Sequence, residues 1–265
     1  MEILKSETAI TGYKSPFEFI NRENFTLSYS GSLQSVITEE LEALQNPQYF
    51  SNTLVLNPPR IIRAIIDFRI ENFQFTNMEE IQAMGVDIAL QLYRYCMTDT
   101  AKAQSFLESF IEYLQFFDRD IYRKLMEQKV IQRDDNVTKM AYNPRLSQAT
   151  ADRIRNPHNF QNGILFLVIG HGGIPAGLDV YLRLNPKDSI LYPFRFSRSK
   201  LHDKTPQITY EQESLLIRLQ QEHPNILLFD EDITSGKTIE GTRKFLRGIF
   251  PDQRIDYYYN YNNNE

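Results

Sequence analysis

Hydrophobic positions follow two different periods along the chain. From residue 76 to residue 132, apolar side chains recur every three or four positions, which predicts helices. Beyond residue 150, short apolar runs alternate with amphipathic segments, and this alternation predicts a parallel α/β sheet. We therefore expect a mainly helical N-terminal region over 1–150, and an α/β core over 151–265.

The second half separates into individual strands and helices. We predict strands at 163–170, 189–197, 225–230 and 254–261, and helices at 177–184, 210–223 and 238–250. The runs at 163–170 and 225–229 carry no charged side chain, which is typical of strands buried on both faces.

The first half is harder to divide. Pro58 and Pro59 predict a break in the chain, because proline has no N–H group for a helix. The apolar run at 61–70 fits either a helix or a strand, and the pattern over the first 50 residues favours neither.

Helix boundaries are predicted where polar residues precede apolar periodicity. Asn77 and either Thr98 or Asp99 are expected N-caps, because their side chains can accept hydrogen bonds from the first turn. The polar segment 133–160 contains two Asn-Pro steps and predicts an irregular connection into the second half.

Composition narrows the class of protein. The 265 residues are 42% hydrophobic and 24% charged, as in globular proteins, and 29 basic against 34 acidic side chains give a net charge of −5. The small excess of acidic side chains argues against broad nucleic-acid binding.

A single cysteine, Cys96, excludes an intrachain disulfide. With no signal-peptide pattern at the start and no long apolar run, we expect a soluble cytoplasmic protein without membrane contact.

The most informative motif covers residues 226–238. Four apolar residues lead into Asp230 and Glu231, and two linking residues precede a hydroxyl-rich turn and a helix. In a parallel sheet, ligands lie beyond the carboxyl ends of the strands, where these carboxylates can accept hydrogen bonds from sugar hydroxyls. The turn is formed by Thr234, Ser235, Gly236, Lys237 and Thr238. Its backbone N–H groups and hydroxyls suit a phosphate monoester.

This motif resembles the signature of the type I phosphoribosyltransferases over its full length. The resemblance implies that Asp230 and Glu231 bind the ribose hydroxyls of phosphoribosyl pyrophosphate (PRPP) and contact Mg²⁺ indirectly, through substrate or water. It also implies that residues 234–238 bind the 5′-phosphate. The C-terminal half is then a core of the phosphoribosyltransferase type, extending over about 160–260.

Two other interpretations of residues 226–238 remain open. The segment can be a strand, a polar turn and a capped helix with solvated carboxylates. It also ends like a Walker A nucleotide-binding loop, but that loop needs a glycine at position 231, where this chain has Glu231. Acidic residues there would repel the phosphates, so spacing and charge both disfavour this second alternative.

Two upstream segments extend the resemblance. His171, Gly172 and Gly173 follow the first predicted strand, where the family has its pyrophosphate-binding loop, although an arginine or lysine is more usual at position 171. A basic segment resembles the flexible loop that closes over pyrophosphate in the family. Its candidate residues are Arg195, Arg198, Lys200 and Lys204. The expected catalytic residues are Arg198 and Lys200 of this segment together with Asp230 and Glu231. The other interpretation is a solvated basic hairpin.

The resemblance implies an Mg²⁺-dependent enzyme of nucleotide metabolism that transfers ribose 5-phosphate from PRPP to a nitrogenous acceptor. Thr234 stands where purine 6-oxo salvage members carry Asp, which disfavours hypoxanthine and guanine as acceptors. The family often forms homodimers, and its acceptor-selecting hood would have to come from the N-terminal half. The alternative is a regulatory protein that keeps the PRPP or nucleotide site without transfer activity.

Overall fold

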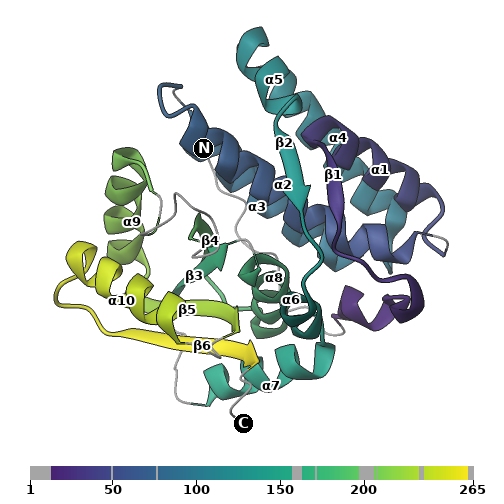
Figure 1. Ribbon diagram of the computed structural model, residues 1–265. Coiled ribbons are helices and arrows are strands. Elements are labelled where there is room, and N and C mark those ends of the chain that lie inside the picture. Colours follow the sequence, from purple (N-terminus) through teal and green to yellow (C-terminus); the bar gives the residue numbers. More distant parts are fainter. Residues whose placement is uncertain are drawn as a thin grey trace. The chain divides into compact units, whose positions relative to one another are not determined.

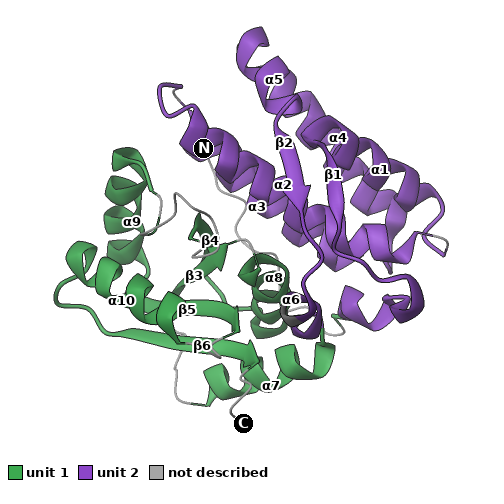
Figure 2. Cartoon of the chain, viewed as in Figure 1, with its two compact units in different colours: residues 1–13, 143–265 green, residues 14–142 purple. Residues whose placement is uncertain are grey.

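The chain divides into two compact units, residues 14–142 and residues 1–13 with 143–265 (Figure 2). The computed structural model describes residues 13–48, 50–75, 77–156, 163–170, 172–196, 206, 208–232 and 236–261. The sequence-based boundary at residue 150 falls inside a helix, α7 (Pro144–Arg155). Within the described ranges, no helix combines the length and the apolar character needed to cross a bilayer.

The unit formed by residues 14–142 is mainly helical, as the apolar periodicity predicts (Figure 1). Its helices are α1 (Leu33–Gln45), α2 (Ser51–Glu71), α3 (Met78–Tyr95), α4 (Thr100–Gln115), α5 (Arg119–Met126) and α6 (Asn136–Ala141), with two short 3₁₀ turns at Pro16–Phe19 and Arg22–Asn24. Helices α1 to α4 share one apolar core that includes Ile37, Ile65, Leu92 and Leu107. Asp99 caps α4 through a bond from the Lys102 N–H, whereas Asn77 precedes α3 without a side-chain cap bond.

Two local predictions for residues 129–160 are wrong. Residues Lys129–Gln132 form strand β2, which pairs antiparallel with β1 (Tyr29–Ser32), because a distant partner overrides the local period. The expected irregular connection at 133–160 contains α6 and α7 instead. At α7, the Asn143 side chain accepts a hydrogen bond from the Arg145 N–H, and Pro144 occupies the first turn, where proline is well tolerated. This Asn-Pro step therefore starts a helix.

The prolines do not break the chain either. Helix α2 runs through Pro58 and Pro59, and the run at 61–70 is part of it. Proline at position 59 leaves the Val55 carbonyl without its usual helical donor. The buried Tyr93 hydroxyl on α3 donates to that carbonyl at 2.8 Å. A side chain from the next helix thus replaces the missing backbone bond.

The second unit contains the predicted parallel sheet. Its strands are β3 (Ile164–Gly170), β4 (Ile190–Arg195), β5 (Asn225–Asp232) and β6 (Ile255–Tyr261), in the order β4-β3-β5-β6 and all parallel. The helices are α7, α8 (Gly173–Leu184), α9 (Tyr210–Glu222) and α10 (Lys237–Ile249). The prediction of an α/β fold with a mainly helical N-terminal part is confirmed.

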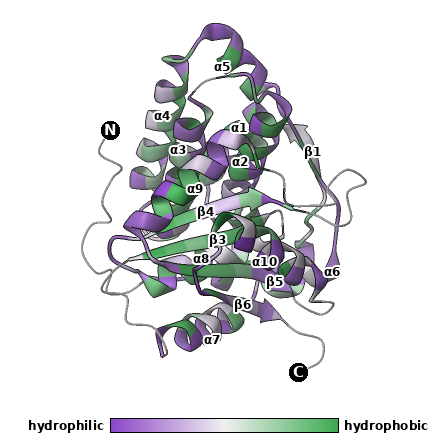
Figure 3. Cartoon of the chain, turned by 90° about the vertical axis from the view of Figure 1, so that its left-hand side faces the viewer, coloured by the Kyte–Doolittle hydropathy of each residue, from purple (hydrophilic) through white to green (hydrophobic). Residues whose placement is uncertain are grey.

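Helices cover both faces of this sheet. Leu216 of α9 and Leu246 of α10 belong to one apolar cluster with Leu167 and Leu228 of the sheet. On the other face, α8 packs so closely that a Cβ atom at Gly177 would lie 2.8 Å from Val168. In Figure 3 the central strands β3 and β5 are the hydrophobic layer of this unit. The charge-free runs in the sequence are explained by this double covering.

The path of the chain creates a switch point between β3 and β5. After β3 the chain moves to β4 on one side, and then returns to β5 on the other side of β3. The connections after β3 and β5 therefore diverge at the carboxyl edge of the sheet. In open α/β sheets, ligands bind in the crevice that such a divergence leaves.

Candidate functional site

The turn after β3 and the acids at the end of β5 meet at this switch point. A Cβ atom on Gly172 would overlap Oε1 of the Glu231 side chain, and one on Gly173 would lie 3.6 Å from the Cα atom of Asp230. Parallel pairing explains this approach, because Val168 stands opposite Phe229 and the next residues leave the ladder together. At Gly172 a side chain would displace the Glu231 carboxylate, whereas a Cβ atom at Gly173 would make only ordinary van der Waals contacts.

Asp230 is the buried member of the acidic pair. It is 6% exposed, and its Oδ1 accepts a hydrogen bond from the Glu231 N–H at 3.0 Å. Burial raises the pKa of Asp230 well above its ordinary value, and the negative charge and side-chain hydrogen bond of Glu231 raise it further. Two adjacent carboxyl groups that resist joint ionisation suit a ligand that brings hydroxyl groups or positive charge.

Helix α10 follows this pair in the chain and packs against β5. Gly236 is its N-cap residue with φ of 63°, a left-handed conformation that favours glycine, and Lys237 is the first helical residue. No side-chain cap bond is described at this helix start. Its first N–H groups can therefore bind an anion, and Thr238 lies in the same turn.

Several predicted site residues lie outside the described residues. They are His171, Arg198, Lys200, Lys204, Thr234 and Ser235. Arg195 is described: it ends β4, stands opposite Gly170 in the ladder and is half-buried. The site as described thus combines Gly172, Gly173, Asp230 and Glu231, with Arg195 one strand away.

The register of β6 against β5 brings further residues to the carboxyl edge of the sheet, and the sequence analysis did not predict them. Tyr259 of β6 stands opposite Asp230, and Tyr261 stands opposite Asp232. Asp232 itself follows the acidic pair and adds negative charge that raises the pKa of Asp230. The tyrosine-rich run was visible in the sequence, but its register against β5 was not.

The described part of the chain contains no group of three or more His, Cys, Asp or Glu side chains able to hold a metal ion. Asp230 and Glu231 supply two carboxyl groups at most. This donor set fits a cation that takes its remaining oxygen ligands from a bound substrate and from water.

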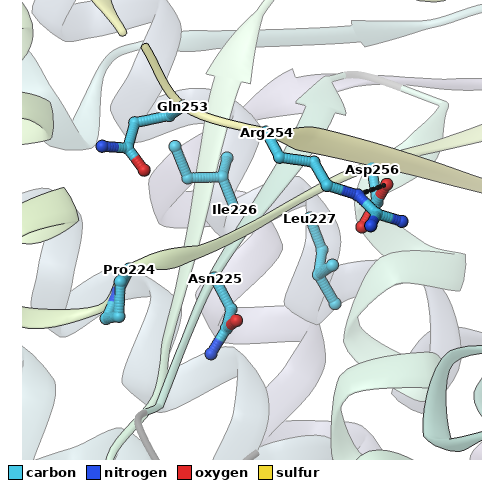
Figure 4. Close-up of a pocket in the computed structure, with 7 residues that line it drawn as sticks. All are labelled: Pro224, Asn225, Ile226, Leu227, Gln253, Arg254 and Asp256. Carbon is cyan, nitrogen blue, oxygen red and sulfur yellow. Dashed lines mark hydrogen bonds and ion pairs between the residues drawn. The ribbon is translucent and has the colours of Figure 1, made fainter. Parts of the chain in front are cut away.

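A surface hollow of about 170 Å³ lies at the opposite, amino-terminal ends of β5 and β6 (Figure 4). Its lining residues are Pro224, Asn225, Ile226, Leu227, Gln253, Arg254 and Asp256. None of the predicted site residues contributes to it. The acidic pair stands at the end of β5, whereas the hollow is at its beginning.

Comparisons of the chain with known protein families, with curated proteins and with solved structures find no significant match.

Proposed function

We propose that this protein is an Mg²⁺-dependent phosphoribosyltransferase that moves ribose 5-phosphate from PRPP to a nitrogenous acceptor and releases pyrophosphate. The observation that carries the proposal is the approach of Gly172 to Glu231 at the switch point. A glycine turn suited to an anion and an acidic pair suited to a sugar are adjacent there. The motif over 226–238 resembles the family signature at the same position.

Each part of the site has a role in binding PRPP. Asp230 and Glu231 accept hydrogen bonds from the ribose hydroxyls. The start of α10, from Gly236 to Thr238, together with Thr234 and Ser235, holds the 5′-phosphate through N–H and hydroxyl donors. His171, Gly172 and Gly173 receive the pyrophosphate at the start of α8, where backbone N–H groups can approach closely.

The transfer step forms one bond and breaks another at the anomeric carbon. The lone pair of the acceptor nitrogen forms the new C–N bond, while the C–O bond to pyrophosphate breaks and its electron pair leaves with pyrophosphate. A proton on the acceptor nitrogen passes to solvent. Arg195, Arg198, Lys200 and Lys204 offset the charge that grows on the leaving group. Asp230 and Glu231 would hold Mg²⁺ indirectly, through substrate or water, and the bound ion would supply further neutralisation of that charge.

A second candidate function keeps the site without the transfer. Residues 14–142 form a compact unit with its own core, which is large for an accessory element. His171 in place of a permanent cation weakens the pyrophosphate-binding turn. Both features favour a regulatory protein that binds PRPP or a nucleotide.

Pyrophosphate release distinguishes the two functions. The full chain is incubated with PRPP, Mg²⁺ and a panel of purine, pyrimidine and small amine acceptors. Release that depends on one acceptor supports the transferase. Saturable PRPP binding without release under any acceptor supports the regulatory protein, and the absence of both contradicts both proposals.

A further inference from the structure

Helix α1 carries an ionisable side chain inside the apolar core of the helical unit. Glu40 is 0% exposed, and Val36, Ile37 and Leu44 of the same helix belong to that core. Within the described residues, neither carboxyl oxygen of Glu40 has a hydrogen-bond partner. An ionised Glu40 would therefore be a buried charge without a partner, which is strongly unfavourable. Loss of its proton requires a rearrangement of the groups around it.

Arg60 of α2 is a buried cation that acts on Glu40. Burial raises the pKa of Glu40 well above its ordinary value, and the positive charge of Arg60 opposes that rise. Asn57 links the two side chains, because it accepts a hydrogen bond from Arg60 at 2.9 Å and donates one to the Val36 carbonyl at 3.1 Å. In an α-helix, this carbonyl belongs to the turn that ends at Glu40. One amide side chain and one helical turn thus separate Arg60 from Glu40.

The described hydrogen bonds of Arg60 all go to neutral acceptors. Besides Asn57, Arg60 donates to Oε1 of Gln132 at 3.2 Å and to the Leu27 carbonyl at 3.3 Å. Its guanidinium group lies 4.2 Å from the centre of the Tyr29 ring. Because Tyr29 pairs with Gln132, these contacts attach one end of the β1–β2 ribbon to α2. A carboxylate would be a stronger partner for Arg60 than any of these neutral acceptors.

The other titratable groups around Glu40 come from α1, β1 and the end of α3. Glu39 adds negative charge that raises the pKa of Glu40, and it accepts a hydrogen bond from the Tyr29 hydroxyl at 3.1 Å. Burial, together with the charge and hydrogen bond of Glu39, raises the pKa of Tyr29 to about 12. Burial and the charge of Glu40 raise the pKa of the Cys96 thiol well above its ordinary value. All buried residues of α4 and α5 are apolar. Tyr29 and Cys96 therefore keep their protons near neutral pH.

We propose that Arg60 exchanges hydrogen-bond partners when Glu40 loses its proton. With Glu40 protonated, Arg60 holds the β1–β2 ribbon through Leu27 and Gln132. With Glu40 ionised, the guanidinium group turns to the carboxylate and leaves these two acceptors, so this end of the ribbon loosens. The helical unit then has two arrangements that pH interconverts. This inference does not depend on the proposed transferase activity.

The test is a titration of the ¹³C- and ¹⁵N-labelled full chain between pH 5 and pH 9, followed by carbon-detected shifts. We expect the Arg60 Cζ signal and the Leu27 carbonyl signal to shift with one common midpoint. Amide exchange in the β1–β2 ribbon, corrected for the intrinsic effect of pH, should be at least about tenfold faster above this midpoint than below it. Glu40→Gln keeps the shape of the side chain without its charge, and should abolish both changes.

A neighbouring acid provides the matched control. Glu39→Gln leaves Glu40 in place and should keep the transition, with a lower midpoint, because the charge of Glu39 raises the pKa of Glu40. Absence of a transition at Arg60 in the wild type, or the same transition in Glu40→Gln, would overturn the proposal. A transition confined to α1, with the Leu27 carbonyl unchanged, would also overturn it, since Glu40 would then ionise without taking Arg60 from the ribbon.

Discussion

Buried polar side chains have different hydrogen-bond partners in the two units. In the helical unit, Arg60 is 4% exposed and donates to the Leu27 carbonyl, to Asn57 and to Gln132, so it ties separate segments to α2. In the α/β unit, Asp230 is almost as buried, yet its described hydrogen bonds are with the neighbouring Glu231. Arg60 stabilises the fold, whereas Asp230 stands at a strand end with capacity to bind a ligand. The two buried groups therefore differ in position: Arg60 joins segments of the helical core, and Asp230 stands at the strand end where we propose a ligand site.

Glu40 sharpens this contrast. It is 0% exposed on α1, and neither of its carboxyl oxygens has a hydrogen-bond partner within the described part of the chain. Burial raises its pKa well above 4.5, and the nearby positive charge of Arg60 opposes that rise. Unlike Asp230, Glu40 lies at no switch point and faces no glycine turn. We expect it to cost stability and to have no part in ligand binding.

The largest effect is expected at the acidic pair. Asp230→Asn combined with Glu231→Gln replaces both carboxyl groups by neutral amides with little change in volume, and should reduce turnover or PRPP binding at least about 100-fold. Because the raised pKa of Asp230 means that its ionisation opposes folding, the double variant should be at least as stable as the wild type near neutral pH, with a free energy of unfolding higher by up to about 1 kcal/mol. Activity and urea unfolding of the double variant measure these effects. Glu240→Gln, an exposed acid in the first turn of α10, is the matched control. Unchanged turnover and binding in the double variant would refute the assigned role.

A smaller loss is expected at the glycine turn. Gly172→Ala places a Cβ atom where the Glu231 carboxylate lies, so the acid must move away from the turn. We expect PRPP affinity to fall about tenfold to 100-fold, as measured by calorimetry. Gly248→Ala is the control, because a Cβ atom there meets nothing within 4 Å. Equal affinities for the two variants would show that the approach of Gly172 to Glu231 is not part of the site.

In the helical unit the expected effects are on stability. Tyr93→Phe removes the donor that replaces the missing proline N–H at the Val55 carbonyl. The free energy of unfolding should fall by about 1–3 kcal/mol, because a buried acceptor loses its partner. Tyr257→Phe, at a side chain that is 42% exposed, should change it by less than about 0.5 kcal/mol. If Tyr93→Phe is as stable as the wild type, α2 tolerates its prolines for another reason.

The smallest effect depends on pH. The raised pKa of Glu40 means that the folded chain binds its proton more tightly than the unfolded chain does. The contribution of Glu40 to the free energy of unfolding is most favourable below pH 4.5, and it is lost as the pH rises toward the folded-state pKa. Glu40→Gln should therefore gain about 1 kcal/mol over the wild type between pH 5 and pH 8, measured by urea unfolding. A difference that does not change with pH would contradict the assignment of a buried, protonated Glu40.

Local pattern predicted the α/β unit better than the helical one. Charge-free runs identify β3 and β5, because strands buried on both faces tolerate few polar residues. Tertiary contacts decided what the pattern missed: Tyr93 supports the proline pair in α2, and pairing with β1 makes a strand of Lys129–Gln132. At the candidate site, residue types were readable from the sequence. The contact between Gly172 and Glu231 depends on strand order, which no local pattern contains.

The central claim is that the carboxyl edge between β3 and β5 binds a phosphorylated sugar. Its most direct measurement is a titration of the ¹⁵N-labelled full chain with PRPP and Mg²⁺, followed by amide shifts. The account predicts saturable shifts centred on Gly172, Gly173, Asp230, Glu231 and Gly236, all absent in the Asp230→Asn, Glu231→Gln double variant. Saturable shifts confined to other parts of the chain, or no shifts at saturating PRPP and Mg²⁺, would contradict it.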